Sequence, residues 1–123
     1  MTFDWQGDQI SWCVELAVKP GELDNFRALT NEMVNSTMEE PGVLIYERFL
    51  SEDGKVVHLY ERYADSSAAV THLLAFQKLH GERFMKMVDR KRFTVFGSPS
   101  EALRNILNGL GATYATPLAG FSR

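Results

Sequence analysis

The sequence has few of the features that mark secreted, membrane or metal-binding proteins. Its 123 residues include one cysteine, Cys13, so the chain cannot form an internal disulfide, a CxxC redox pair or a zinc site made of several thiolates. No apolar run approaches the roughly 20 residues that a membrane-spanning helix needs. The first residues, MTFDWQGDQISW, lack the basic start and apolar run of a signal peptide. We therefore expect a cytoplasmic protein with no membrane partner and no metal site.

An excess of charge of one sign is also absent. The chain has 13 Lys and Arg residues against 16 Asp and Glu residues, which gives a net charge of -3, and these residues are spread along the sequence. Domains that bind nucleic acids usually carry a basic patch, and the one basic cluster here is the run Arg90 to Arg92. We interpret this run as a charged rim and expect no nucleic-acid partner. A hydrophobic content of 45% is ordinary for a single globular domain of this length.

Hydrophobic periodicity predicts a mixture of strands and helices. Residues 10–18 alternate apolar and polar side chains, as a strand does, and residues 22–39 carry an apolar stripe with helical spacing. Pro41 and Gly42 end that helix. The stretch SEDGK is typical of a hairpin turn between two further strands. In chain order we expect a strand at 10–18, a helix at 22–39, strands at 43–50 and 56–63, a helix at 66–76, a break near 77–81, more helix to about 88 and a strand at 91–97.

This order, β-α-β-β-α-β, is the ferredoxin-like split βαβ arrangement of an α+β protein. In this arrangement the two helices cover one face of the sheet, and the other face needs a partner. Val43, Ile45 and Phe49, or their neighbours in the alternate register, would make that face apolar. We therefore expect a homodimer, a dimeric α/β barrel in which aromatic and charged side chains line a pocket between the two sheets.

The hairpin turn determines which side chains share a face of the sheet. If Ser51 and Lys55 close the turn, Glu61 lies on the face opposite Tyr46 and Tyr60. A shift of one residue would exchange these groupings. In either register both faces combine large apolar side chains with ionisable ones, so we expect both faces to be covered.

Residues 98–123 lie beyond this core pattern. Ser98 and Pro99 favour the start of a short helix, and the last residues, ATYATPLAGFSR, are typical of a short extended piece and a tail. We divide the chain into a ferredoxin-like domain at 1–98 and a C-terminal helix with an extended tail at 99–123, which packs on the same domain or on its dimer partner. We expect the extended piece to pair with a sheet edge, that of the partner, and Phe121 to be buried.

Four motifs together carry a family resemblance. VKPGELDNF, EEPGVLIYERF and LYERYAD, followed by AVTHLLAF, resemble in order and spacing the antibiotic biosynthesis monooxygenase family, from about Ile10 to about Gly97. The resemblance implies a dimeric α+β barrel. For a member similar to the quinol monooxygenases it also implies a reaction without a cofactor, in which an electron-rich aromatic substrate gives an electron to dioxygen.

The sequence departs from the family pattern in two places. Tyr63 stands where the family commonly has Trp, and the usual Pro-His-Phe close after the second helix is absent, so no role passes to His80. The pattern of the heme-degrading branch of the family has Asn on the first strand and Trp in the second helix. Here the first strand has no Asn and the helix carries His72, which argues against heme degradation.

The resemblance also indicates candidate catalytic residues. It places a His early in the second helix, so His72 is the leading base for deprotonating the substrate, because imidazole titrates near neutral pH. Glu61 matches the family's strand Glu and could orient a histidine or accept a hydrogen bond from a substrate hydroxyl. The alternatives are a structural His72 bound to a strand and an ion pair between Glu61 and an arginine.

Further candidates would bind the substrate. Tyr46, Tyr60 and Tyr63 could form the walls of an aromatic site, although aromatic residues on strands are more often core. Arg92, at the start of the last long strand, could stabilise an oxyanion or form a salt bridge at the rim. The sequence thus leaves three functions open: a cofactor-independent monooxygenase of a quinol or polyphenol, a non-catalytic dimeric module that binds a small aromatic ligand, and an interaction protein.

Overall fold

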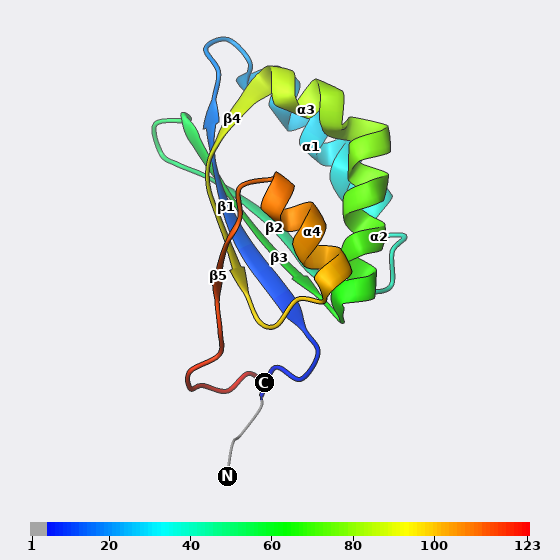
Figure 1. Ribbon diagram of the computed structural model, residues 1–123. Helices are drawn as coiled ribbons and strands as arrows, with labels where there is room; N and C mark the ends of the chain where they lie inside the picture. Colours follow the sequence, from blue (N-terminus) through cyan, green and yellow to red (C-terminus); the bar gives the residue numbers. More distant parts are fainter. Residues whose placement is uncertain (1–4) are drawn as a thin grey trace.

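A five-stranded sheet with helices on one face forms the protein (Figure 1). The structure is a computed structural model that describes residues 5–123. It confirms the α+β class and the ferredoxin-like arrangement. In chain order the elements are β1 (Ile10–Val18), α1 (Leu23–Thr37), β2 (Val43–Leu50), β3 (Val56–Tyr63), α2 (Ser66–Phe76), the π-helical turn η1 (Gln77–Gly81), α3 (Glu82–Met87), β4 (Val88–Phe96), α4 (Glu101–Gly109) and β5 (Thr113–Ala115).

The strands lie in the order β2-β3-β1-β4-β5. The four long strands pair antiparallel, and β5 pairs parallel with β4 of its own chain. The expectation that this last strand pairs with the partner's sheet edge is therefore wrong for the single chain. Because β5 extends the chain's own sheet, the C-terminal segment adds a strand to the same core.

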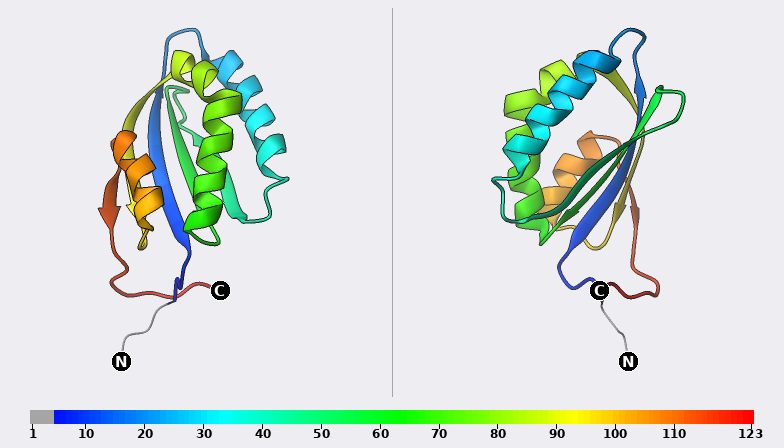
Figure 2. Two further views of the ribbon diagram at one scale, coloured as in Figure 1. Left: turned by 45° about the vertical axis from the view of Figure 1, so that its right-hand side comes forward. Right: turned by 180° about the vertical axis from the view of Figure 1, so that it is seen from behind.

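The helices pack on one face of the sheet, and Figure 2 shows the other face without any helix. The core between the two layers is apolar because alternate residues of each strand meet the apolar stripes of the helices. Each large side chain buried in this way contributes roughly 1.5–3 kcal/mol to stability. The side chains buried most completely are Ile10, Trp12, Leu16, Tyr63, Val88, Val95, Leu103 and Leu107.

The helix starts follow from local side-chain chemistry. Asp65 caps α2 by accepting a hydrogen bond of 2.8 Å from the backbone N–H of Ala68. Ser100 caps α4 in the same way through Leu103, so this helix begins after Pro99 rather than at it. The expected break after α2 is a π-helical turn, and the helix continues into α3. Gln77, the first residue of this turn, is exposed and lies at the edge of a cavity described below.

The hairpin has the alternate register. Tyr46 pairs with Glu61 and Arg48 with Leu59, so Tyr46 and Glu61 share the face under the helices. The register inferred from the sequence was wrong because Ser51 pairs with Val56, which makes the loop one residue longer than assumed. The longer loop is stable because the Ser51 hydroxyl also accepts a hydrogen bond from the backbone of Val56.

A β-bulge in β4 changes which face its arginines occupy. Glu15 of β1 lies opposite Arg92, but the next residue, Leu16, lies opposite Arg90, so Lys91 is an extra residue in the ladder. An extra residue moves the side chains beyond it to the other face of the strand. Arg90 therefore shares the helix-covered face with Leu16, and Arg92 lies on the uncovered face.

The C-terminal tail runs below the sheet, near the N-terminal end of the described chain (Figure 1). Its Gly120 lies against the ring of Trp5. Phe121 is 69% exposed, and the Arg123 guanidinium stacks on its ring. Phe121 is thus not buried within the single chain, and its expected burial against a dimer partner stays a prediction.

The Pro-Gly motif before β2 has a packing reason that can be tested. A Cβ atom on Gly42 would lie 2.6 Å from the Cβ atom of Ala68 in α2, and this contact has no flexible side chain that could move away. We expect Gly42→Ala to lower the free energy of unfolding by roughly 1–3 kcal/mol, measured by urea denaturation. Gly109→Ala, where the added atom meets nothing within 4 Å, is the matched control and should leave stability unchanged or raised. Equal stability of the two variants would contradict this explanation.

Candidate functional site

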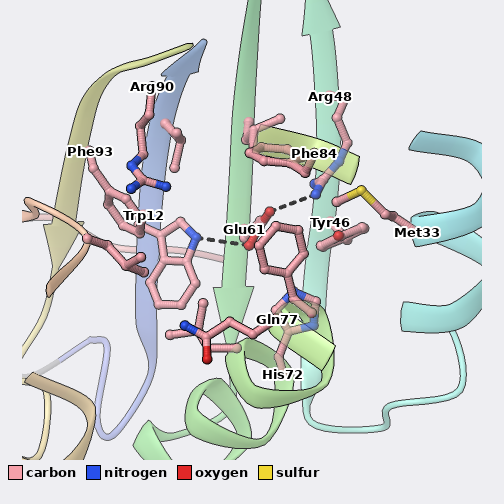
Figure 3. Close-up of a pocket in the computed structure, with 15 residues that line it drawn as sticks. Trp12, Met33, Tyr46, Arg48, Glu61, His72, Gln77, Phe84, Arg90 and Phe93 are labelled. Carbon is pink, nitrogen blue, oxygen red and sulfur yellow. Dashed lines mark hydrogen bonds and ion pairs between the residues drawn. The ribbon is translucent and has the colours of Figure 1, made fainter. Parts of the chain in front are cut away.

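A cavity of about 60 Å³ lies between the sheet and the helices of the single chain (Figure 3). This volume holds a few water-sized groups. The expectation of a pocket between two sheets is therefore wrong for these side chains, because Tyr46 and Glu61 share the face of the sheet under the helices. The apolar walls include Trp12, Met33, Tyr46, Phe76, Phe84 and Phe93, and the polar groups are Arg48, Glu61, His72, Gln77 and Arg90.

Glu61 is the most buried charged group of the cavity, with 4% of its surface exposed. Three donors on three strands bind its carboxylate. The indole Nε1–H of Trp12 and the hydroxyl of Tyr63 donate to Oε1 over 2.9 Å and 2.5 Å, and the guanidinium of Arg48 donates to Oε2 over 2.8 Å. The lone pairs of Glu61 are thus largely used within the protein.

The charge state of Glu61 follows from these contacts. Burial by itself would raise the pKa of this carboxyl group, but the charge of Arg48, that of His72 when its ring is protonated, and the hydrogen bonds from Tyr63 and Arg48 hold the pKa below its ordinary value. Glu61 is therefore ionised, its charge is balanced by Arg48, and it anchors the side chains that bind it. It does not have the raised pKa of a general acid.

His72 projects from α2 toward the sheet and is 5% exposed. Its Nδ1 atom lies 3.2 Å from the Oε2 atom of Glu40, in the loop between α1 and β2. An ionised carboxylate can only accept, so we assign the proton to Nδ1, which leaves Nε2 with a free lone pair. The ring packs against Tyr46 and Tyr63, with centroids 5.3 Å and 5.5 Å away. This arrangement gives a fixed imidazole with one nitrogen able to accept a proton.

The two tyrosines beside His72 remain protonated. Burial, followed by the charge of Glu61, raises the pKa of Tyr46 to about 12 and raises that of Tyr63 well above its ordinary value. The guanidinium of Arg48 stacks on the Tyr46 ring, 3.4 Å from its centroid. Tyr46 lines the cavity, whereas Tyr63 is fully buried behind Glu61.

The other two residues suggested by the sequence lie elsewhere. Tyr60 is on the uncovered face of the sheet, where its hydroxyl accepts a hydrogen bond of 3.0 Å from Arg62. Arg92 is exposed on the same face, opposite Glu15. Neither residue lines the cavity, because Tyr60 lies between the buried Leu59 and Glu61 in β3, and Arg92 precedes the buried Phe93 in β4.

Comparison with known proteins identifies the family. Residues 11–79, more than half of the chain, match the family model for antibiotic biosynthesis monooxygenase. The chain belongs to this family. No curated protein matches it.

Solved structures share this monooxygenase family fold. MupZ from Pseudomonas fluorescens is 25% identical, with a TM-score of 0.82 over 94% of both chains, so the likeness extends into the C-terminal segment. SnoaB, a cofactor-independent oxygenase from Streptomyces nogalater, is 14% identical, with a TM-score of 0.64 over 76% of this chain and 95% of SnoaB. Rv0793 from Mycobacterium tuberculosis is 26% identical, with a TM-score of 0.57 over 76% of this chain and 98% of Rv0793.

Residues 5–123 contain neither a candidate metal site nor a candidate membrane-spanning helix. Among residues 5–123, no three His, Cys, Asp or Glu side chains come together in a way that could hold a metal ion. No helix in the same residues combines the length and apolar character needed to cross a bilayer. Because Arg48 and Glu61 pair with each other, the polar groups that the cavity of this antibiotic biosynthesis monooxygenase family member offers to a ligand are His72, Gln77 and the guanidinium of Arg90.

Sequence reasoning missed Glu40, Trp12 and Arg90 as parts of the site. Glu40 had no signal, because its contact with His72 spans 32 positions. Trp12 stands on the apolar face of β1 and looked like ordinary core. Arg90 had a usable signal, since Val88 and Phe93 are both buried but five residues apart, which requires one extra residue between them.

The anchoring role of Glu61 gives a stability prediction. Glu61→Gln removes the negative charge and leaves the side chain of Arg48, 9% exposed, without its ion-pair partner. We expect this substitution to lower the free energy of unfolding by about 3 kcal/mol, measured by chemical denaturation at pH 7. Glu52→Gln, exposed in the turn of the same hairpin, should change it by less than about 0.5 kcal/mol. A Glu61→Gln variant as stable as the control would contradict the anchor.

The same anchor predicts a pH dependence. Because the folded-state pKa of Glu61 lies below the ordinary value of 4.5, the stabilisation is complete above about pH 4.5 and is lost as the pH falls through the folded-state pKa. The stability difference between the wild type and Glu61→Gln should therefore shrink between pH 6 and pH 3. A difference that stays constant over this range would show that Glu61 carries no stabilising charge.

Proposed function

We propose that the protein is a cofactor-independent monooxygenase whose substrate is a quinol or polyphenol bound in the cavity beside His72. One observation carries the proposal: the imidazole of His72, held by Glu40, lies in a cavity with aromatic walls. Membership of the antibiotic biosynthesis monooxygenase family supports it. The fold shared with SnoaB, a cofactor-independent oxygenase, adds further support.

The reaction balances without a cofactor because the substrate supplies the electrons. A quinol and one dioxygen molecule become a hydroxyquinone and one water molecule. The ring loses two electrons from its conversion to a quinone and two from the new C–O bond, and these four electrons reduce both oxygen atoms. The protein has to remove a phenolic proton, hold the electron-rich anion and keep bulk water away from the reacting carbon.

His72 is the base in this scheme. The other ionisable groups around it are unsuited to the role: both tyrosines stay protonated, and Glu61 already accepts three hydrogen bonds. Nε2 of His72 would take the phenolic proton, and the carboxylate of Glu40 would stabilise the imidazolium that forms. A positioned base of this kind contributes typically 10²–10⁴-fold to the rate.

Glu61 acts as a positioning residue. By binding Trp12, Tyr63 and Arg48 together, it fixes the aromatic wall behind the substrate ring and holds a compensating negative charge near His72. Tyr46 provides another wall, and the stacked Arg48 fixes its ring. Since the cavity of about 60 Å³ is smaller than a typical ligand pocket, the exposed side chain of Gln77 would have to move when a substrate enters.

The alternative function is a non-catalytic module that binds a small aromatic ligand. It is favoured by the aromatic walls, which need no reactive residue to bind a ring. In that case Nε2 of His72 accepts a hydrogen bond from the ligand and no oxygen is consumed.

We also propose a homodimer formed by the uncovered face of the sheet. Phe49 projects from this face at the edge strand β2 and is 55% exposed, which is unfavourable in water for a large ring. A second copy covering this face would bury it.

Oxygen uptake tests the enzymatic function. Quinones of one to three rings, reduced under anaerobic conditions and then mixed with the protein and air-saturated buffer, should consume oxygen faster than in buffer alone. His72→Gln should lower the catalysed rate at least 100-fold, whereas His58→Gln, an exposed histidine on the opposite face, should retain it. Ligand binding without any catalysed uptake would favour the binding module instead. Full activity of His72→Gln would reject His72 as the base.

Light scattering tests the dimer. At micromolar concentration the protein should have twice the monomer mass, and Phe49→Glu should shift it to the monomer. Leu74→Glu replaces a side chain of α2 that is 53% exposed on the helix layer, and it should remain dimeric. A wild-type protein that is monomeric under these conditions would exclude this assembly.

A further inference from the structure

Arg90 reaches the cavity only because of the bulge at Lys91. Without the extra residue, Arg90 and Arg92 would lie on the same face of β4, since side chains two apart in a strand point the same way. The register shift against β1 turns Arg90 to the helix-covered face instead. Figure 3 shows its guanidinium beside Trp12 and Phe93, directed into the cavity. Bulges that re-aim a side chain in this way are common beside active sites.

The guanidinium of Arg90 has no partner of its own. Arg48, the other arginine of the cavity, is paired with Glu61. For Arg90 no hydrogen bond, ion pair or stacked ring occurs within the described residues 5–123. Arg90 is partly exposed, and partial burial in the cavity lowers the pKa of its guanidinium from the ordinary value. An uncompensated cation in an apolar cavity is expected to bind an anion.

The position of Arg90 indicates which part of a ligand it would contact. In Figure 3 Arg90 and His72 lie on opposite sides of the group formed by Trp12 and Glu61. A ring that presents a hydroxyl to His72 would therefore direct its far end toward Arg90. Since Glu61 is neutralised by Arg48, it does not strongly oppose a second anion in the cavity. The group bound by Arg90 is thus separate from the reacting hydroxyl.

We propose that Arg90 binds a carboxylate at the far end of the substrate, so that the substrate is an aromatic hydroxy acid. A planar guanidinium matches a carboxylate through two parallel hydrogen bonds. A phosphate group would call for more positive charge than this cavity offers, because the charge of Arg48 is already balanced. The inference rests on the proposed function for the place of the hydroxyl beside His72. It does not depend on the oxygen chemistry, so it can be tested by binding alone.

The test compares an acid with its neutral amide. 4-Hydroxybenzoate and 6-hydroxy-2-naphthoate, and the amide of each, are titrated into the full-length protein while the indole N–H signal of Trp12 is followed by NMR. We expect each acid to bind at least tenfold more tightly than its amide and to shift the Trp12 signal. Arg90→Gln should weaken acid binding roughly 10- to 30-fold and leave amide binding unchanged. Arg92→Gln, two residues away on the uncovered face, should bind both ligands as the wild type does.

Stability distinguishes a binding role of Arg90 from a structural one. Removing an unpaired charge should leave the thermal midpoint of Arg90→Gln unchanged or raised by a few degrees. The proposal is wrong if neither acid binds more tightly than its amide, if Arg90→Gln binds the acids as the wild type does, or if Arg90→Gln unfolds several degrees lower. Absence of oxygen uptake would reject the oxygenase function and would leave this inference standing if carboxylate binding depends on Arg90.

Discussion

The buried carboxylate of Glu61 is the constraint on which the site depends. An ionised group at this depth is stable only when donors replace its hydration, and here Trp12, Tyr63 and Arg48 supply them from β1, β3 and β2. The same three contacts fix the aromatic walls and occupy one of the cavity's two arginines, while burial and the charge of Glu61 keep both neighbouring tyrosines protonated. As a result His72 is left as the group able to accept a proton and Arg90 as the group able to bind an anion.

Backbone packing places His72 opposite this anchor. Gly42 lets the start of β2 approach Ala68 at the beginning of α2. The carbonyl of Gly42 also accepts a hydrogen bond of 2.9 Å from the backbone N–H of Ala64. One turn after Ala68, the helix presents His72 to the sheet and to Glu40. The Pro-Gly motif, the strand Glu and the helix His of the antibiotic biosynthesis monooxygenase family therefore belong to one packed unit in this chain. Their spacing in the sequence reflects contacts between adjacent elements.

Sequence periodicity predicted the element order and the ferredoxin-like arrangement, because both depend on local patterns of apolar residues. The faces of the strands were harder to predict. They depend on loop length at Ser51 and on one extra residue at Lys91, and each of these moves a whole set of side chains across the sheet. For this reason Tyr60 instead of Glu61 was grouped with Tyr46, and Arg90 was interpreted as a rim charge. The long-range contact of His72 with Glu40 also left no trace in the local pattern.

We propose that one chain holds the substrate between its own sheet and helices, beside His72. A crystal structure of the protein with a reduced quinol, grown and frozen without oxygen, tests this claim most directly. We expect the ring in the cavity against Trp12 and Tyr46, with a hydroxyl oxygen about 2.6–3.2 Å from Nε2 of His72. A ring bound instead on the uncovered face of the sheet, between two copies and near Tyr60 and Arg92, would contradict the account.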